Sequence, residues 1–344
     1  MPMLTALVGL AGALIYGSAD FLGGLAAKRL SAVLVTAVAA SSGLLVLLVA
    51  LPFVGGVWSP TAVLWGALSG LTGAIAISLL YACLAIGPMS ILSPLTAVVS
   101  AIVPMTAGLV GGERLAPVGY AALGLALVAV VLVGFVPEKG AVRPTTLGVL
   151  MAIGSGIMIG AFLILIDLTP DDSGLVPLVL NRAVNAAIMF STVGVLAFVA
   201  AHRRRVLAGV GASGGDASGG DASGVSSNAG RGGSDPASGF GATDAVTRAA
   251  DPATVPGDTG RRSRSTLTIG LTLAAVCGLV DVAANLLLLI GIRIGDLSVI
   301  SVLTAMYPAG TILLAAVVLK ERIAPVQWVG LGLALAAAAM LALA

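Results

Sequence analysis

The chain has 344 residues, of which 58% are hydrophobic and only 9% are charged, and its mean hydropathy is +1.12. Soluble domains average about 25% charged residues, so this composition excludes an ordinary soluble protein and predicts one that resides in a lipid bilayer. The net charge of +2 argues against nucleic acid as a partner.

Apolar segments, each long enough for a membrane-spanning helix, follow one another along the chain. They occupy residues 4–26, 32–52, 61–86, 89–110, 117–136, 146–168, 174–201, 266–291, 296–319 and 324–343. The first lacks a preceding basic region and is longer than the apolar core of a signal peptide, so we expect it to be retained as a span. Pro94, Pro104 and Pro308 interrupt the fourth and ninth segments, where they permit bending. The pattern predicts an all-α polytopic membrane protein with ten transmembrane helices.

Residues 87–133 and 295–340 repeat each other without a gap, and each contains two apolar runs joined by a charged turn, as in a transmembrane hairpin. The matches include Ser93 with Ser301, Leu95-Thr96-Ala97 with Leu303-Thr304-Ala305, and Glu113-Arg114 with Glu321-Arg322. Such a match indicates internal duplication. The charged pairs lie at the membrane edge, where we expect them to cap and orient the hairpins.

The first copy contains Gly-Pro-x-Ser, Ser-Pro-Leu and Gly-Glu-Arg in this order, and the second copy contains part of the same pattern. With this pattern and the doubled hairpin, the chain resembles the EamA-like permeases of the drug/metabolite transporter superfamily over most of its length. The resemblance implies a secondary transporter that exports small, amino-acid-like metabolites by alternating access. Multidrug or cation efflux is the alternative. We expect it to be a multi-pass protein of the plasma (inner) membrane.

The duplication extends weakly upstream, where residues 16–23 in the first segment resemble residues 153–160 in the sixth. Five segments per copy is an odd number, so the second copy enters the membrane with the opposite orientation. The sequence therefore predicts two inverted five-helix repeats, residues 1–140 and 141–344, an arrangement found in many alternating-access transporters.

Residues 203–265 interrupt the second repeat and consist mainly of Gly, Ser, Ala, Asp and Pro. Such a segment has too few large apolar side chains to fold, which predicts a disordered loop. Either the loop is a neutral insertion or it serves regulation or partner binding.

Basic residues concentrate in the loops that follow odd-numbered segments. They are Lys28, Arg29, Lys139, Arg143, the arginines that bracket the polar insert, Lys320 and Arg322, against Arg114 and Arg293 in the even-numbered loops. The positive-inside rule favours cytoplasmic odd-numbered loops and termini on the outside. The family resemblance leaves the orientation open.

An ionisable side chain at the centre of a transmembrane helix costs at least about 2.5–3.5 kcal/mol, so each one requires an explanation. Asp281 lies well inside the eighth segment, and Asn285 follows one turn later on the same face. Arg182 lies in the seventh segment, which is antiparallel to the eighth. At about 1.5 Å per residue, Arg182 is roughly 12 Å, and Asp281 roughly 15 Å, from the membrane face that carries the even-numbered loops. We expect these residues to share a cavity that binds substrate or protons, or else to form a structural ion pair. A third alternative is that Arg182 snorkels toward the interface.

Further candidates are Asn181 and Asn185, which lie on the seventh segment with Arg182. Asp20, in the first segment, has no carboxylate counterpart in the second repeat. It is either a proton-exchanging group or an interfacial acid paired with the basic residues 28–29. Three tyrosines are candidates for lining a cavity or for anchoring at the interface, namely Tyr16, Tyr81 and Tyr307.

Other function classes lack the residues they need. Cys83 and Cys277 lie in apolar segments without neighbouring ligands and His202 stands beside arginines, so we expect no metal, no cofactor and no Ser-His-Asp triad. No GxxxxGK[ST] sequence is present, which argues against ATP as the driving force. A membrane-embedded enzyme would depend on the acids at 167–172, which resemble a solvated loop, and a channel would need a filter or charged rings.

We therefore expect a transporter rather than an enzyme, with a small-molecule substrate, surrounding lipid, and protons as a candidate coupling ion. The sequence leaves open the identity of the substrate, the direction of transport, the coupling ion and the oligomeric state.

Overall fold

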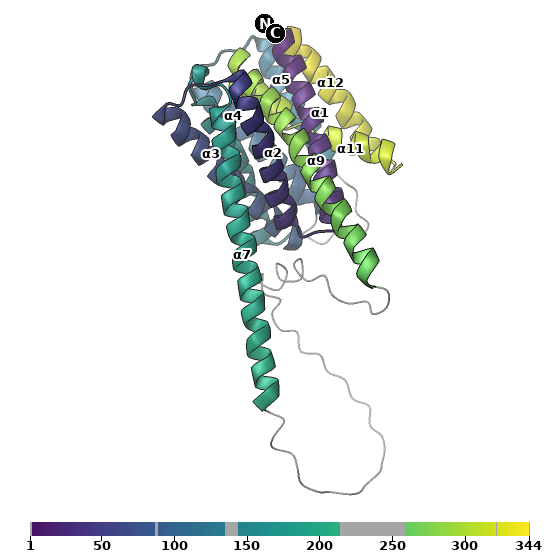
Figure 1. The fold of residues 1–344 in the computed structure, drawn as a ribbon. Coiled ribbons are helices and arrows are strands. Elements are labelled where there is room, and N and C mark those ends of the chain that lie inside the picture. The colour runs from purple at the N-terminus through teal and green to yellow at the C-terminus, as the bar shows by residue number, and fades with distance from the viewer. Residues whose placement is uncertain (1, 87–88, 135–143, 214–258, 321, 344) are drawn as a thin grey trace, which may run out of the picture.

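The structure, a computed structural model, describes residues 2–86, 89–134, 144–213, 259–320 and 322–343 (Figure 1). Its α-helices are α1 (Pro2–Ala27), α2 (Ala32–Val54), α3 (Pro60–Ile86), α4 (Met89–Val110), α5 (Pro117–Gly134), α6 (Thr146–Asp167), α7 (Val176–Ser213), α9 (Thr259–Ile294), α10 (Leu297–Thr304), α11 (Tyr307–Val318) and α12 (Pro325–Leu343). A short 3-10 helix, η1 (Asp171–Ser173), precedes α7.

Within these described ranges, ten helical spans are long and apolar enough to cross a membrane, and α10 and α11 together form one of them. Large apolar side chains cover the outside of the bundle. Phe53, Phe198 and Leu335 are 86%, 73% and 63% exposed, as expected for helices that contact lipid tails. The predicted all-α membrane fold is confirmed.

Several helices begin at residues that suit a helix start. Pro60, Pro117 and Pro325 are the first residues of α3, α5 and α12, a position where the missing N–H of proline costs little. Ser31 and Thr145 precede α2 and α6, and each side-chain hydroxyl accepts a hydrogen bond from a backbone N–H in the first turn. These local signals explain why most predicted boundaries lie close to the observed ones.

The prolines that interrupt the fourth and ninth segments affect the helices differently in the two repeats. Pro94 and Pro104 both lie inside one continuous helix, α4. In the second repeat α10 ends at Thr304 and α11 begins at Tyr307, with Pro308 in its first turn. A proline in the first turn of a helix loses no internal hydrogen bond, so the chain breaks the span here into two shorter helices.

Helices also extend into the segment predicted as a loop at 203–265. α7 continues to Ser213 and α9 begins at Thr259, and the arginines at both ends of this segment favour helix. Parts of the sequence predictions lie outside the described residues, namely the insert at 214–258, Lys139, Arg143 and Glu321.

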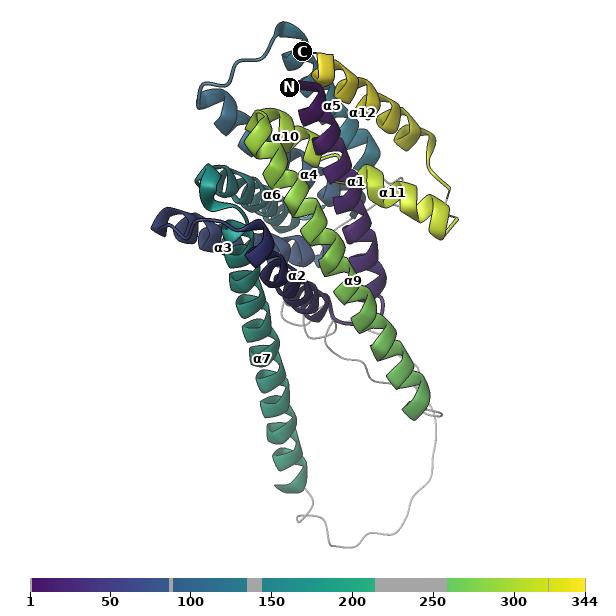
Figure 2. The same ribbon diagram turned by 45° about the horizontal axis from the view of Figure 1, so that its top comes forward.

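The contacts between helices relate the two halves of the chain. α1 packs on α9 as α3 packs on α6, α2 packs on α9 as α3 packs on α7, and α1 packs on α11 as α4 packs on α6. The pairs α2–α7, α4–α10 and α5–α12 each join equivalent helices of the two halves. This pattern is compatible with the predicted inverted repeat. Figure 2 shows α1 lying between α9 and the pair formed by α11 and α12.

The loops form two opposite faces. Residues 55–59, 111–116, 168–175 and 295–296 connect helices on the face that carries both ends of the chain, which we term the even-loop face (Figure 1). Residues 28–31, 319–320 and 322–324 lie on the opposite, odd-loop face, where α7 extends beyond the other helices (Figure 1).

Candidate functional site

A cavity of about 210 Å³ lies between the two halves of the bundle. α1, α3 and α4 line it from the first half, and α6, α9, α10 and α11 line it from the second. The lining residues are Tyr16, Asp20, Ile77, Leu80, Ser100, Ile159, Phe162, Leu163, Asp281, Leu288, Ser301, Thr304, Ala305 and Tyr307. A concave, mainly apolar site with a few polar groups is typical of a small-molecule binding site.

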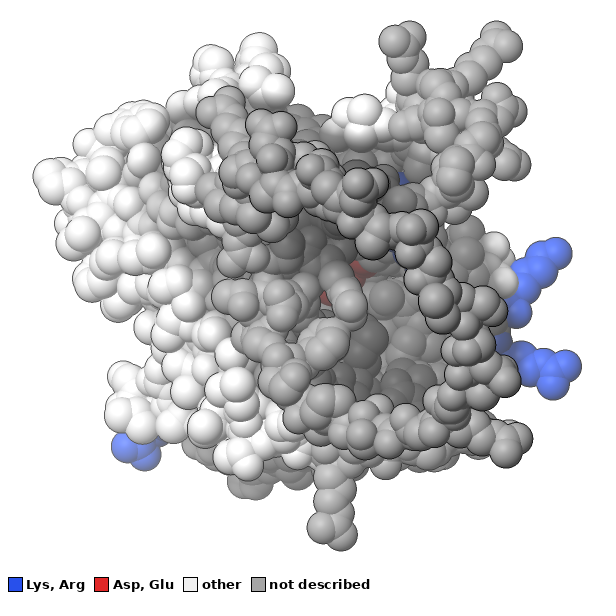
Figure 3. All heavy atoms as spheres, turned by 90° about the horizontal axis from the view of Figure 1, so that it is seen from below, with Lys and Arg blue, Asp and Glu red and all other residues white. Residues whose placement is uncertain are grey.

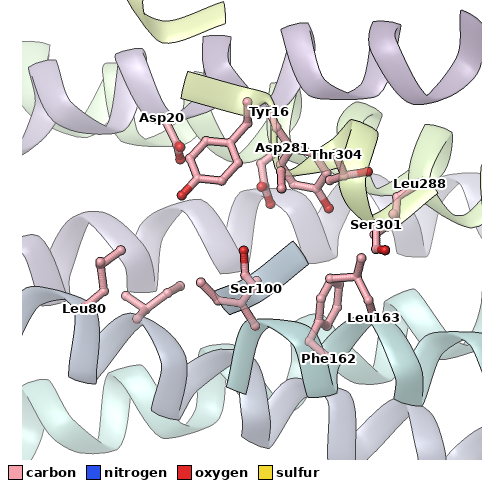
Figure 4. A pocket seen from close by; sticks show the side chains of 14 residues that line it. Tyr16, Asp20, Leu80, Ser100, Phe162, Leu163, Asp281, Leu288, Ser301 and Thr304 are labelled. Atoms are coloured by element: carbon pink, nitrogen blue, oxygen red, sulfur yellow. The ribbon is translucent and has the colours of Figure 1, made fainter. Parts of the chain in front are cut away.

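Several polar groups lie together on one side of this cavity. Tyr16, Asp20, Asp281 and Thr304 are on one side, and Leu80 and the side chains from α6 face them (Figure 4). Four of the residues predicted as candidates thus line one cavity, since Tyr307 also belongs to the lining with Tyr16, Asp20 and Asp281.

Asp20 is exposed to the cavity. Among the interactions of the described residues, its carboxylate takes part in no hydrogen bond and no ion pair. The interfacial pairing with residues 28–29, one of the two alternatives for Asp20, is therefore not present in this structure. An unpaired carboxylate between membrane-spanning helices is costly, which makes Asp20 a candidate for binding a cationic group or a proton.

Asp281 is paired within the protein. The Arg182 guanidinium, from α7, donates to Asp281 Oδ2, and the two side chains are 11% and 23% exposed. Asn285 Nδ2 donates to the same carboxylate oxygen at 3.2 Å and to the Asp281 carbonyl at 2.7 Å. The structure thus combines two of the arrangements that the sequence left open, because Asp281 forms an ion pair and also lines the cavity.

The other predicted residues of α7 lie away from the cavity lining. Asn181 is buried and its Nδ2 donates to Ser69 Oγ of α3 at 3.0 Å, so it joins two helices. Asn185 is also buried, near Gly73 of α3. Tyr81 belongs to α3, but its side chain lies outside the described part of the structure.

A contact on the even-loop face joins the two halves. Glu113, which follows α4, accepts hydrogen bonds from the backbone N–H groups of Leu297 at 2.7 Å and Ser298 at 3.0 Å. These N–H groups begin α10, where a helix has unpaired donors and favours negative charge. The expected capping role of Glu113 is present, but the helix that it caps belongs to the other repeat.

The turn before Glu113 explains how its side chain reaches α10. Gly112 has a φ of +110°, which favours glycine, and the Glu113 side chain packs over Gly108, where an added Cβ would lie 2.7 Å from Glu113 Cδ. Lys320, the counterpart of Gly112 in the repeat, also has a positive φ of 56°. The two copies therefore share this turn conformation.

Two further contacts hold the even-loop face together. Leu175 N donates to Gly55 O at 3.3 Å, which joins the halves. Arg293, at the end of α9, donates to Thr169 O at 2.7 Å and to Asp171 Oδ1 at 3.0 Å.

The carboxyl group of Asp296 lies at the start of α10. Burial, and to a lesser extent the nearby Glu113 carboxylate, raise the pKa of Asp296.

The odd-loop face is hollowed. Seen from this side, acidic atoms are visible at the bottom of the hollow (Figure 3). The two halves are therefore joined by hydrogen bonds on the even-loop face, and the odd-loop face is hollowed.

Sequence reasoning did not select Ser100, Phe162, Ser301 and Thr304 as site residues, yet all of them line the cavity. The internal repeat contained a signal for two of them, since Ser301 and Thr304 both match identical residues of the first copy. Among the described residues, no group of three or more His, Cys, Asp or Glu side chains is placed to hold a metal ion.

Comparison with known proteins supports the fold and the family resemblance. A solved structure titled "Crystal structure of protein" aligns with a TM-score of 0.61 at 16% identity, covering 99% of this chain and 98% of that chain. At this identity the likeness shows the fold alone. No curated protein matches the chain. The family model of the EamA-like transporter family matches residues 258–343. This match confirms the resemblance seen in the sequence, and it identifies residues 258–343 as an EamA-like region, part of the drug/metabolite transporter superfamily.

Proposed function

We propose that this chain is a secondary transporter that moves a small molecule across the membrane by alternating access. The family match suggests a transporter and not an enzyme. The observation that carries the proposal is the cavity between the two halves, together with an even-loop face where Glu113 joins the halves and an odd-loop face that is hollowed (Figure 3). A transporter that alternates between two openings must pass through such a state.

The two halves of the transporter, residues 1–140 and 141–344, act as the two moving units in this proposal. The helix contacts support it, because equivalent helices meet at the interface between the halves. Small repeat-to-repeat rotations change which face is open around a fixed central site.

Export from the cell is the proposed direction, and the plasma membrane is the proposed location. Basic residues favour a cytoplasmic odd-loop face, and the structure is hollowed from that face (Figure 3). A substrate would then enter from the cytoplasm and leave when the even-loop face opens.

The proposed site comprises the lining residues Asp20, Tyr16, Tyr307 and Asp281, supported by Arg182 and Asn285. The substrate expected from the family resemblance is amino-acid-like, and a drug or other cation is the alternative. Asp20 is the candidate for proton coupling, since its carboxylate faces the cavity without a partner.

Flux through proteoliposomes that contain the full chain tests the proposal. A transporter predicts saturable accumulation of at least one member of a panel of amino acids and organic cations, dependent on an ion gradient. A proton gradient of either direction then tests the coupling ion. Non-saturable flux that only dissipates gradients would indicate a channel, and chemical conversion of a panel member would indicate an enzyme. Either result would overturn the proposal.

A further inference from the structure

The charges that face the cavity are both negative. Among the lining residues, all of which the structure describes, the acidic side chains are Asp20 and Asp281, and none is lysine or arginine. The substrate site is thus not lined by a group that would pair with a carboxylate of the substrate.

Only one of the two carboxylates is free to bind a substrate charge. Asp281 pairs with the Arg182 guanidinium and also accepts a hydrogen bond from Asn285. The Asp281–Arg182 pair has no net charge, so it adds little long-range field to the cavity. Asp20, exposed and unpaired, leaves the cavity with one uncompensated negative charge.

Aromatic side chains line the same cavity as Asp20. Tyr16 lies one turn before Asp20 on α1 and beside it in Figure 4, and Tyr307 lines the cavity from α11. Phe162 lines the opposite side from α6 (Figure 4). The faces of aromatic rings attract cations, and they recognise ammonium groups that carry alkyl substituents. The opposite wall is mainly apolar, with Ile77 and Leu80 of α3 and Ile159 and Leu163 of α6, which suits an apolar substrate body.

We propose that the substrate is a small organic monocation, with its charged group at Asp20 and the rings of Tyr16 and Tyr307 and with its apolar body against α3 and α6. This inference rests on the transport function proposed above and selects the cation alternative over the amino-acid-like one. A zwitterion would leave its carboxylate beside Asp20 and Asp281 with no cationic lining group, and such a like-charge arrangement disfavours binding.

The inference is tested by the binding of three probes, each of which contains one phenyl ring. The probes are benzyltrimethylammonium, phenylalanine and phenylacetate, and binding to the purified full chain in nanodiscs is measured by titration calorimetry. We expect only the cation to bind. Asp20→Asn should weaken this binding at least about tenfold, and Asp20→Glu, which keeps the charge, should restore most of it.

Asp172→Asn is the matched control, since Asp172 is exposed on the even-loop face outside the cavity. It should bind the cation as the unaltered chain does. The inference is overturned if Asp20→Asn binds the cation as tightly as the unaltered chain, if the cation does not bind to the folded protein, or if phenylalanine or phenylacetate binds more tightly.

Flux measured with the same probes separates this inference from the proposed function. Gradient-dependent flux of phenylalanine without cation binding would keep the transporter and reject the cation site. Binding of the cation at Asp20, together with an absence of saturable flux for every probe, would keep the cation site and reject the transporter.

Discussion

At the residue scale, one ion pair determines which of the two carboxylates in the cavity is left without a cationic partner. Asp281 and Asp20 both face the cavity, but only Asp281 has a cationic partner, Arg182. Asn285 holds the Asp281 carboxylate from one turn further along α9. The pair therefore satisfies two charges that would each be costly alone between helices, and Asp20 remains the unpaired carboxylate among the lining residues of the cavity.

Breaking the ion pair should alter the charge of the cavity in a predictable way. Asp281→Asn leaves the Arg182 guanidinium uncompensated, and we expect binding of benzyltrimethylammonium to weaken by about tenfold. The double variant Asp281→Asn/Arg182→Gln removes both charges, so binding should return to within about threefold of that of the unaltered chain. Calorimetry on both variants measures the effect.

Elution as a single species and thermal unfolding of each variant control for loss of the fold, because removing one member of a buried pair is destabilising. If the single variant binds the cation as well as the double variant does, Arg182 does not compensate Asp281 in the manner described here.

At the scale of elements, close helix contacts set the width of the cavity. Gly17 of α1 packs directly on the backbone of α11, and Thr311 Oγ1 donates to Gly17 O at 3.0 Å. Tyr16 and Tyr307, which line the cavity, flank this contact on the two helices. The absence of a side chain at Gly17 therefore lets both rings approach the same space.

Gly17→Ala should push α1 and α11 apart. The new Cβ would lie 2.6 Å from Thr311 N and 2.7 Å from Gly310 Cα, and overpacking of this kind typically costs about 1–3 kcal/mol. Thermal unfolding in detergent should show a lower midpoint. Gly24→Ala on the same helix is the control, because no atom lies within 4 Å of its added Cβ. Equal midpoints for the two variants would contradict the close contact.

At the scale of the whole molecule, the structure is one state of the proposed transport cycle. The helix contacts relate the two halves, and the Glu113 contact to α10 crosses between them on the even-loop face. Opening that face requires Glu113 to leave the start of α10. The contact therefore stabilises the state in which the odd-loop face is open.

Glu113→Gln should shift the molecule toward the opposite opening, because an uncharged amide binds the N-terminus of α10 less strongly than a carboxylate does. Thr304→Cys, introduced after replacement of Cys83 and Cys277 by alanine, places a thiol in the cavity. We expect a membrane-impermeant thiol reagent to label this thiol several-fold faster from the even-loop face in Glu113→Gln. Asp172→Asn is the control, and unchanged labelling from both faces would refute the assigned role of Glu113.

The sequence by itself determined the membrane class, the ten spans and the resemblance to the EamA-like family, and it selected Asp20, Asp281 and Arg182. These features are local, since the length of an apolar run and the cost of a charge within it do not depend on distant residues. Only the tertiary structure decided which charges meet. Arg182 and Asp281 are 99 positions apart, and Glu113 and Leu297 are 184 apart. Their pairing depends on how each helix is rotated and on which helices pack together, and in lipid these are set by close van der Waals contacts between helices.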